Sequence, residues 1–310
     1  MRERIVETTD LPSDLQQWRA DTPGCRRRVH LNNAGAALMP AAVLDTMTTF
    51  LERESLIGGY EAADEAAEAV EAARGAMATL LDSHRRNIAF APSGSNAFAQ
   101  AMLSLDFRPG DRIVTSRTDY VSNHLMFLAL RARFGVDVLH IPELPEGGLD
   151  LDGLRGLLRA GRCKVVTVSW MPTNSGLVQD AAGVGHLCRE AGVRFILDAV
   201  QVVGQRPVSM QEIPCDFLVA TSPKYLRGPR GVGVLWISDD ALAAGLYPIT
   251  IDSRGGLWTG PLEFEPAVDG RRFEGWEASY ALILGLGEAA RYCHQVGLGP
   301  AAERILHLAG

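Results

Sequence analysis

Short apolar runs alternate with segments of helical periodicity through most of this chain, and this alternation limits the possible fold more than any other feature. The runs are rich in Val, Ile and Leu, as in Val165-Val166-Thr167-Val168. Strands have such continuous apolar sequences when helices cover both faces of a parallel sheet. The pattern therefore predicts an α/β fold with a mainly parallel seven-stranded sheet flanked by helices. The strands are expected at 88–90, 112–115, 136–141, 165–170, 194–197, 217–220 and 231–237.

Helical periodicity fills most of the remaining sequence. Between 246 and 271 the chain is rich in Gly and Pro, and we expect an irregular crossing segment there. Helices are expected at 41–54, 62–81, from 96 to about 105, at 122–134, 151–159 and 181–191, and from 278 and 300 onward.

An acid and an amine follow two of the predicted strands. Asp198 ends the apolar run 193–197, and Lys224 stands between the run 217–220 and a Gly-Pro-Arg-Gly sequence. The carboxyl ends of parallel strands meet at one edge of a sheet, where open α/β folds bind ligands. Pyridoxal phosphate chemistry requires such a pair, because an acid holds the ring nitrogen and an amine holds the aldehyde as a Schiff base.

Each of these residues also has an ordinary structural interpretation. Asp198 could cap a helix or form a surface ion pair, and a single lysine is most often a solvated surface residue. Only Lys164 and Lys224 occur among the 310 residues, however. In a chain so poor in lysine, a lysine inside a loop bounded by Gly and Pro favours a chemical role.

The turn Pro92-Ser93-Gly94-Ser95-Asn96 separates a predicted strand from a predicted helix. Free N–H groups at a helix start attract a phosphate, and the hydroxyl groups of Ser93 and Ser95 can add hydrogen bonds. The same residues could simply cap the helix. The turn matches neither a P-loop nor a dinucleotide fingerprint, so a nucleotide enzyme is disfavoured.

The composition excludes several classes of protein. Acidic residues outnumber basic residues by 37 to 30, which argues against nucleic acid as a partner. The five cysteines are far apart and odd in number, without zinc spacing, so we expect neither a disulfide framework nor a metal site. Met1–Ile5 lacks a signal-peptide core, and no apolar run is long enough for a membrane. We expect a cytoplasmic protein without a membrane partner.

The sequence resembles the class V aminotransferase family of the type I pyridoxal-phosphate fold, which includes cysteine desulfurases, kynureninases and isopenicillin N epimerase-like proteins. The resemblance covers about 31–287 and rests on the order and spacing of several motifs. These motifs are Leu31-Asn32-Asn33-Ala34-Gly35, Ser93-Gly94-Ser95, Asp119-Tyr120-Val121-Ser122-Asn123, Asn174-Ser175-Gly176, Asp198-Ala199-Val200-Gln201, Lys224 with Gly228-Pro229-Arg230-Gly231, and Arg272-Phe273-Glu274.

The resemblance implies a role for each matching position around pyridoxal 5'-phosphate. Lys224 would form the Schiff base and Asp198 would pair with the ring nitrogen. Gly94, Ser95 and Thr221 would hold the phosphate. The remaining implied positions are Gln201 and Asn174 at the ring hydroxyl, Tyr120 stacked on the ring, and Asn33 near the substrate carboxylate.

The chain departs from the family pattern at several points. Pro223 precedes the lysine where many desulfurases have His, and Trp276-Glu277 stands where relatives often have Gly-Thr, whose Thr reaches the phosphate of the neighbouring subunit. Cys293 falls in an apparent helix and is expected to be packed rather than catalytic. The chain stops at Gly310, short of most of the expected C-terminal domain. Either the sequence is truncated, or one of Arg254, Arg271 and Arg272 binds the substrate carboxylate.

We therefore expect three parts. Residues 1–35 would contribute to the small domain and the active site, 36–260 would form the large cofactor-binding domain, and 261–310 would form a partial small domain. The expected protein is a homodimeric enzyme acting on an amino acid, with β-elimination as in C–S lyases as the first choice. A class V aminotransferase, an epimerase and a non-catalytic pyridoxal-phosphate-binding protein are the alternatives.

Overall fold

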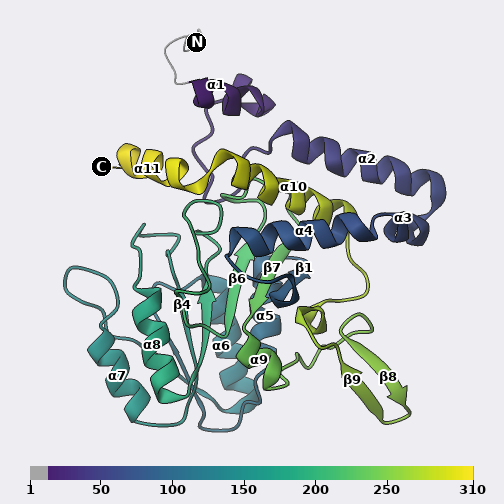
Figure 1. Cartoon of the computed structure of the whole chain (residues 1–310). Helices are drawn as coiled ribbons and strands as arrows, with labels where there is room; N and C mark the ends of the chain where they lie inside the picture. The colour runs from purple at the N-terminus through teal and green to yellow at the C-terminus, as the bar shows by residue number, and fades with distance from the viewer. Residues whose placement is uncertain (1–12, 310) are drawn as a thin grey trace.

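A central sheet of seven strands organises the computed structural model, which describes residues 13–309 (Figure 1). The strand order is β1-β7-β6-β5-β4-β2-β3, which confirms the predicted sheet. In chain order the strands are β1 (Ile88–Ala91), β2 (Arg112–Thr115), β3 (Asp137–His140), β4 (Cys163–Ser169), β5 (Arg194–Asp198), β6 (Phe217–Thr221) and β7 (Gly233–Ile237).

One strand, β7, runs against the direction of the other six. It pairs antiparallel with β1 and β6, whereas all other pairs in this sheet are parallel. Residues 222–232 connect β6 to β7 without a helix. A parallel connection needs a longer crossover, usually through a helix, so this short loop forces the chain to turn back.

Helices cover both faces of the sheet, as the continuous apolar strands require. One face packs against α4 (Ala67–Leu80), α7 (Leu151–Arg159), α8 (Ala181–Ala191) and α10 (Tyr280–Val296). The opposite face packs against α5 (Gly94–Leu103), α6 (Val121–Phe134) and the short α9 (Asp239–Ala243). The result is a three-layer α/β/α arrangement.

Local sequence signals set the ends of these helices. The side chains of Asp150 and Asp180 accept hydrogen bonds from the first backbone N–H groups of α7 and α8. Gly135 and Gly192 follow the last residues of α6 and α8 with φ of 66° and 64°. This left-handed conformation closes a helix and costs glycine little.

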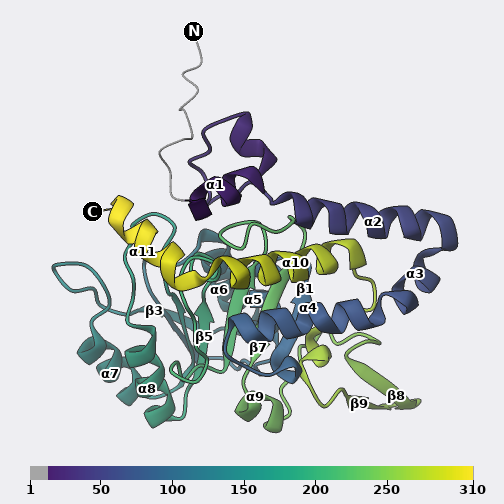
Figure 2. The same cartoon turned by 45° about the horizontal axis from the view of Figure 1, so that its top comes forward.

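The N-terminal and C-terminal helices lie together above the sheet in Figure 2. Helix α2 (Ala41–Ile57) packs along α10, and α11 (Leu298–Ala309) continues from α10. Helices α1 (Ser13–Ala20) and α3 (Gly59–Glu65) flank α2 in the chain, and short 3₁₀ turns occur at Pro23–Arg26, Arg85–Asn87 and Gly270–Phe273. The helix expected at 62–81 is divided, because α3 ends at Glu65 and α4 begins at Ala67.

The segment expected to be irregular contains a β-hairpin instead. Strands β8 (Gly256–Gly260) and β9 (Glu263–Pro266) pair antiparallel and project away from the main sheet in Figure 1. Trp258 lies opposite Phe264 in the register. Aromatic cross-strand pairs of this kind stabilise hairpins, even in a segment rich in Gly and Pro.

The domain boundaries at 35/36 and 260/261 remain predictions, and residues 1–12 of the first part lie outside the described residues. Ile283, Leu286 and Ala290 of α10 belong to the same apolar cluster as one face of the sheet. No helix within residues 13–309 is long and apolar enough to cross a membrane.

Candidate active site

A cavity of about 250 Å³ opens where the same-direction strands end. Strands β1, β2, β4, β5 and β6 all finish at this edge, and the loops that follow them supply its walls. Such an edge is where open α/β sheets bind ligands. The cavity is lined by Ser93, Gly94, Ser95, Tyr120, Asn123, Ser169, Thr173, Asp198, Val200, Gln201, Thr221, Lys224 and Arg230.

Asp198, the last residue of β5, is a buried carboxylate at one end of this set. The backbone N–H of Val200 donates to its Oδ1 at 3.0 Å, and Asn123 Nδ2 donates to its Oδ2 at 3.1 Å. Burial and the nearby negative charge of Asp119 raise the pKa of Asp198 to about 6, against the two hydrogen bonds and the charge of Lys224. Each carboxylate oxygen accepts one of these hydrogen bonds and has a second lone pair, so the group can accept another donor.

A second acid, missed by sequence reasoning, stands behind Asp198. Asp119 accepts hydrogen bonds from Thr115 Oγ1 at 2.8 Å and from Thr167 Oγ1 at 3.0 Å. The Nδ2 atom of Asn123 donates at 3.0 Å to Asp119 Oδ1 as well as to Asp198, so one amide bridges both carboxylates. The sequence signal was the spacing of Asp119 and Asn123, which lie four residues apart where a helix begins.

Lys224 follows β6 in the loop that leads to β7 and faces the same cavity. Burial lowers the pKa of its ammonium group, and the charge of Asp198 opposes this shift. The Nζ atom lies 5.9 Å from the centre of the Tyr120 ring. A lysine with a lowered pKa is more readily neutral, and a neutral amine is the nucleophile that attacks carbonyl carbon.

The turn before α5 provides N–H groups at another side of the cavity. Ser93 caps the helix, because its hydroxyl oxygen accepts the N–H of Asn96 at 3.0 Å. The capping interpretation of this turn is therefore confirmed, and its phosphate-binding role stays a prediction. Gly94 and Ser95 are the first two helical residues, whose N–H groups have no acceptor within a helix. Thr221 ends β6 beside them, since an added Cβ on Gly94 would lie 3.4 Å from the Thr221 Cβ.

Gln201 is 5% exposed and lines the cavity with an unsatisfied acceptor. Its Nε2 donates to Ala34 O at 3.1 Å and to Thr173 Oγ1 at 3.3 Å, whereas its buried Oε1 has no partner among the described residues. Thr173 lines the cavity, but the neighbouring Asn174 is exposed and does not.

The structure brings seven of the nine sequence-predicted site residues to this cavity and leaves two outside it. The seven are Gly94, Ser95, Tyr120, Asp198, Gln201, Thr221 and Lys224. Asn174 lies in the exposed loop after β4, and Asn33 borders a separate cavity of about 610 Å³ beside α1, α10 and α11. The expected roles of Asn174 and Asn33 stay predictions.

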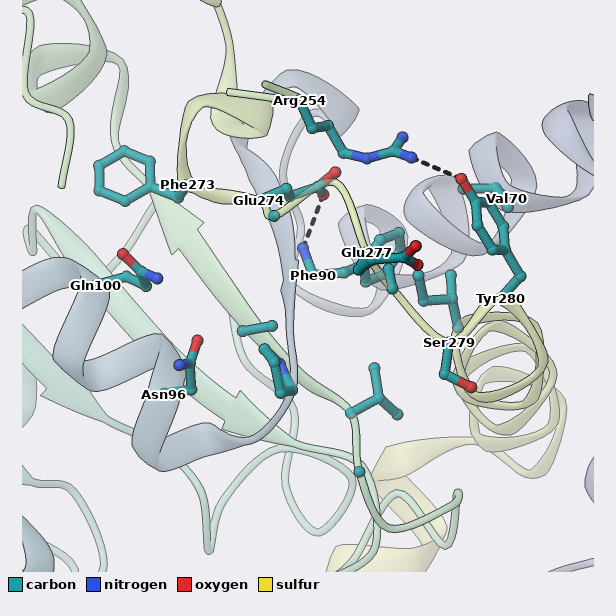
Figure 3. A pocket seen from close by; sticks show the side chains of 17 residues that line it. Val70, Phe90, Asn96, Gln100, Arg254, Phe273, Glu274, Glu277, Ser279 and Tyr280 are labelled. Carbon is teal, nitrogen blue, oxygen red and sulfur yellow. Dashed lines mark hydrogen bonds between the residues drawn. The ribbon is translucent and has the colours of Figure 1, made fainter. Parts of the chain in front are cut away.

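The three arginines considered for a substrate carboxylate all lie elsewhere. Arg272 is buried and donates to the backbone oxygens of Ala267, Leu242 and Leu246, and Arg271 pairs with Asp269 at the surface. Arg254 lines a different cavity of about 310 Å³, where it donates to the hydroxyl of Tyr280 at 2.6 Å (Figure 3).

None of the five cysteines lines the cavity at the strand ends. Cys293 lies in α10, and burial raises the pKa of its thiol to about 11, so it is poorly suited to act as a thiolate. No group of His, Cys, Asp and Glu within residues 13–309 could hold a metal ion.

Comparison with known proteins gives concordant matches. A family model described as aminotransferase class-V matches residues 29–309. A probable cysteine desulfurase of Xylella fastidiosa is 28% identical, over 98% of this chain and 76% of its own length. The apo structure of a cysteine desulfurase from Thermococcus onnurineus has a TM-score of 0.83 at 24% identity, over 92% of this chain and 72% of its own. A cystine C–S lyase, solved with its product cysteine persulfide, has a TM-score of 0.82 at 23% identity, over 91% and 75%.

Proposed function

The chain belongs to the class V aminotransferase family and is a pyridoxal 5'-phosphate-dependent enzyme, and from this premise we propose that it cleaves the carbon–sulfur bond of a sulfur-containing amino acid by β-elimination. The cavity at the strand ends would hold both the cofactor and the amino acid. One observation carries this proposal: a buried acid, Asp198, and a desolvated amine, Lys224, line one cavity beside the first turn of α5.

The residues of the cavity fit this cofactor at each of its polar groups. The Asp198 carboxylate can accept the proton of the ring nitrogen, and the unpartnered Oε1 of Gln201 can accept the ring hydroxyl. The N–H groups of Gly94 and Ser95 and the hydroxyl of Thr221 can donate to the phosphate. Tyr120 can cover a face of the ring, and Lys224 can hold the aldehyde.

The cofactor supplies an electron sink for bonds broken at the substrate α-carbon. Lys224 would take the proton from that carbon, because its lowered pKa leaves a share of the amine neutral and able to act as a base. Asp198 would keep the ring nitrogen protonated, and the hydrogen bonds from Val200 N–H and the Asn123 amide favour its ionised form. The thiolate then leaves from the β-carbon.

One observation favours a sulfur-directed reaction over transamination and epimerisation, and a second favours elimination over sulfur transfer to a cysteine of the enzyme. The relatives and structural neighbours above are named as cysteine desulfurases or a cystine C–S lyase. No cysteine of the described chain lines the cavity, so the cavity itself offers no thiol to receive sulfur. Elimination needs none, because cysteine and water yield pyruvate, ammonium and sulfide.

The test is to incubate the holoenzyme with cysteine, cystine and a panel of other amino acids. We expect pyruvate and ammonium in equal amounts, with sulfide from cysteine and a persulfide from cystine. Amine transfer to a keto acid, or racemised substrate, would replace elimination by one of the alternative reactions. A protein that binds the cofactor but changes no amino acid would be a non-catalytic binder.

We also propose that two copies associate and that the protein works in the cytoplasm. Leu262, Val268 and Trp258, in and next to the β8–β9 hairpin, are 98%, 85% and 77% exposed. Exposed apolar side chains gathered on one element are typical of an interface between subunits. All five cysteines are free thiols, as expected in a reducing compartment. Light scattering at micromolar concentration should give a dimer mass, and a monomer would exclude this association.

A further inference from the structure

Arg230 is a cation that lines the strand-end cavity without a partner in the described chain. It is exposed, and its guanidinium makes no hydrogen bond or ion pair with any of residues 13–309. Two buried arginines, by contrast, are engaged: Arg74 pairs with Glu274, and Arg272 donates to three backbone oxygens. An unpaired guanidinium beside a cavity keeps all five of its donors available.

The loop that carries Arg230 is fixed at both ends. At its start, the Gly228 N–H donates to Ser222 O at 2.9 Å, and a Cβ on Gly228 would collide with the Ser222 Oγ. Arg227 anchors the same stretch, since its side chain donates to Leu38 O and to the Thr22 hydroxyl. The backbone position of Arg230 is therefore set by packing.

The end of this loop lies against the turn that starts α5. Gly233, the first residue of β7, pairs with Thr221, and a Cβ at Gly233 would lie 2.5 Å from the Ser93 backbone. Arg230 is three residues earlier, so its backbone is within about 10 Å of that turn. An arginine side chain spans most of this distance. Arg230 thus belongs to the end of the cavity formed by Gly94, Ser95 and Thr221.

Among residues 13–309, Arg230 and Lys224 are the basic side chains that line the cavity. A phosphate monoester carries about −1.5 to −2 charge at neutral pH, and N–H groups and hydroxyls are neutral donors. The amine of Lys224 is engaged at the aldehyde in the proposed function, so within the described chain Arg230 is the basic side chain left for the phosphate. Guanidinium groups bind phosphate with paired hydrogen bonds that are stronger than neutral ones.

We propose that Arg230 is the counter-ion of the cofactor phosphate and thereby sets the preference for the phosphorylated cofactor over pyridoxal. This assignment rests on the proposed binding of pyridoxal phosphate in this cavity. Arg230 is a positioning residue, because it acts on a part of the cofactor that takes no part in bond breaking. A solvated surface arginine, the ordinary alternative, would contribute nothing to cofactor affinity.

The test compares the dissociation constants of pyridoxal phosphate and pyridoxal for the cofactor-free protein, by absorbance titration. We expect Arg230→Ala to weaken pyridoxal phosphate about 10- to 100-fold, as loss of a charge-assisted bond predicts, and to leave pyridoxal unchanged. Arg230→Lys should recover part of the loss. Arg133→Ala removes the same charge from the exposed last turn of α6, outside the cavity, and should change neither affinity.

Three results would overturn the assignment in distinguishable ways. If wild type binds no pyridoxal phosphate, the proposed function fails and the assignment fails with it. If wild type and Arg230→Ala bind pyridoxal phosphate equally, the function stands and the role of Arg230 is wrong. If the variant loses affinity for pyridoxal to the same extent, Arg230 acts on the ring or on the fold and not on the phosphate.

Discussion

Replacing Asp198 by Asn should make the cofactor-free protein more stable at neutral pH while weakening its hold on the cofactor. Burial raises the pKa of Asp198 from an ordinary value of 3.8 to about 6. A group with a higher pKa in the folded state than in the unfolded state stabilises the fold only while it is protonated. Its contribution is complete below pH 4 and is lost as the pH rises through 6.

The size of the effect follows from that shift. Each pKa unit corresponds to about 1.36 kcal/mol, so the complete loss is about 3 kcal/mol, of which about 2.5 kcal/mol falls between pH 4 and pH 8. An Asn at this position does not titrate. The two carboxylate oxygens now accept the Val200 N–H and the Asn123 amide, and Asn keeps only one of these two acceptors. Losing the other hydrogen bond lowers the unfolding free energy by about 1 kcal/mol at every pH.

Urea unfolding of the cofactor-free proteins between pH 4 and pH 8 provides the measurement. The unfolding free energy of Asp198→Asn minus that of wild type should rise by about 2.5 kcal/mol across this range, and other titrating groups cancel in the difference. Asp45→Asn, which removes an exposed acid from α2, is the control and should show no such rise. A difference that stays constant with pH would show that Asp198 is not held at a raised pKa.

Four further changes test other parts of the molecule. Lys224→Ala should abolish the covalent fixation of the cofactor by borohydride that peptide mass mapping finds in wild type, and persistence of the label would place it on another residue. Asn123→Ala removes the donor shared by two buried carboxylates, so the pH below which cofactor affinity declines should move upward in absorbance titrations. Cys293→Ala should retain wild-type sulfide release, because the thiol is half-buried in α10 and desolvation raises its pKa to about 11; a complete loss of sulfide release would show that this cysteine accepts sulfur. Arg74→Met leaves the buried Glu274 carboxylate without its ion partner at 2.7 Å, which should cost about 3–5 kcal/mol in urea unfolding, and a cost below about 1 kcal/mol would contradict this account.

The strands could be predicted from the sequence because a parallel strand that is buried on both faces is a continuous apolar run. The runs 194–197 and 217–220 coincide closely with β5 and β6, since apolar side chains on both faces leave little alternative. The direction of β7 could not be predicted in this way, because a buried apolar run has the same residue pattern in a parallel and in an antiparallel strand. The loop length of 222–232 was the available indication.

Residues of the candidate site could be predicted from the sequence where the residue type itself indicates a chemical role. Lys224 and Asp198 stand out as a lone lysine and a strand-end acid, whereas the Asn123 amide acts only because folding brings it between Asp119 and Asp198. Asn174 illustrates the opposite case. Its position in the motif suggests a contact with the cofactor, and the neighbouring Thr173 lines the cavity whereas Asn174 is exposed, so that role stays a prediction.

In the proposed function, the charges along the cavity favour one orientation of the cofactor. Lys224 and Asp198 are close enough for the charge of Lys224 to affect the pKa of Asp198, and we have proposed that Arg230 holds the phosphate near the first turn of α5. A reversed cofactor would place its phosphate against the buried pair of Asp119 and Asp198, whose mutual repulsion already raises the pKa of Asp198. A further anion there would be repelled in a low-dielectric environment, at a cost of several kcal/mol. In the proposed function, the two acids would therefore help to orient the cofactor, because they would repel its phosphate while Asp198 binds the ring nitrogen.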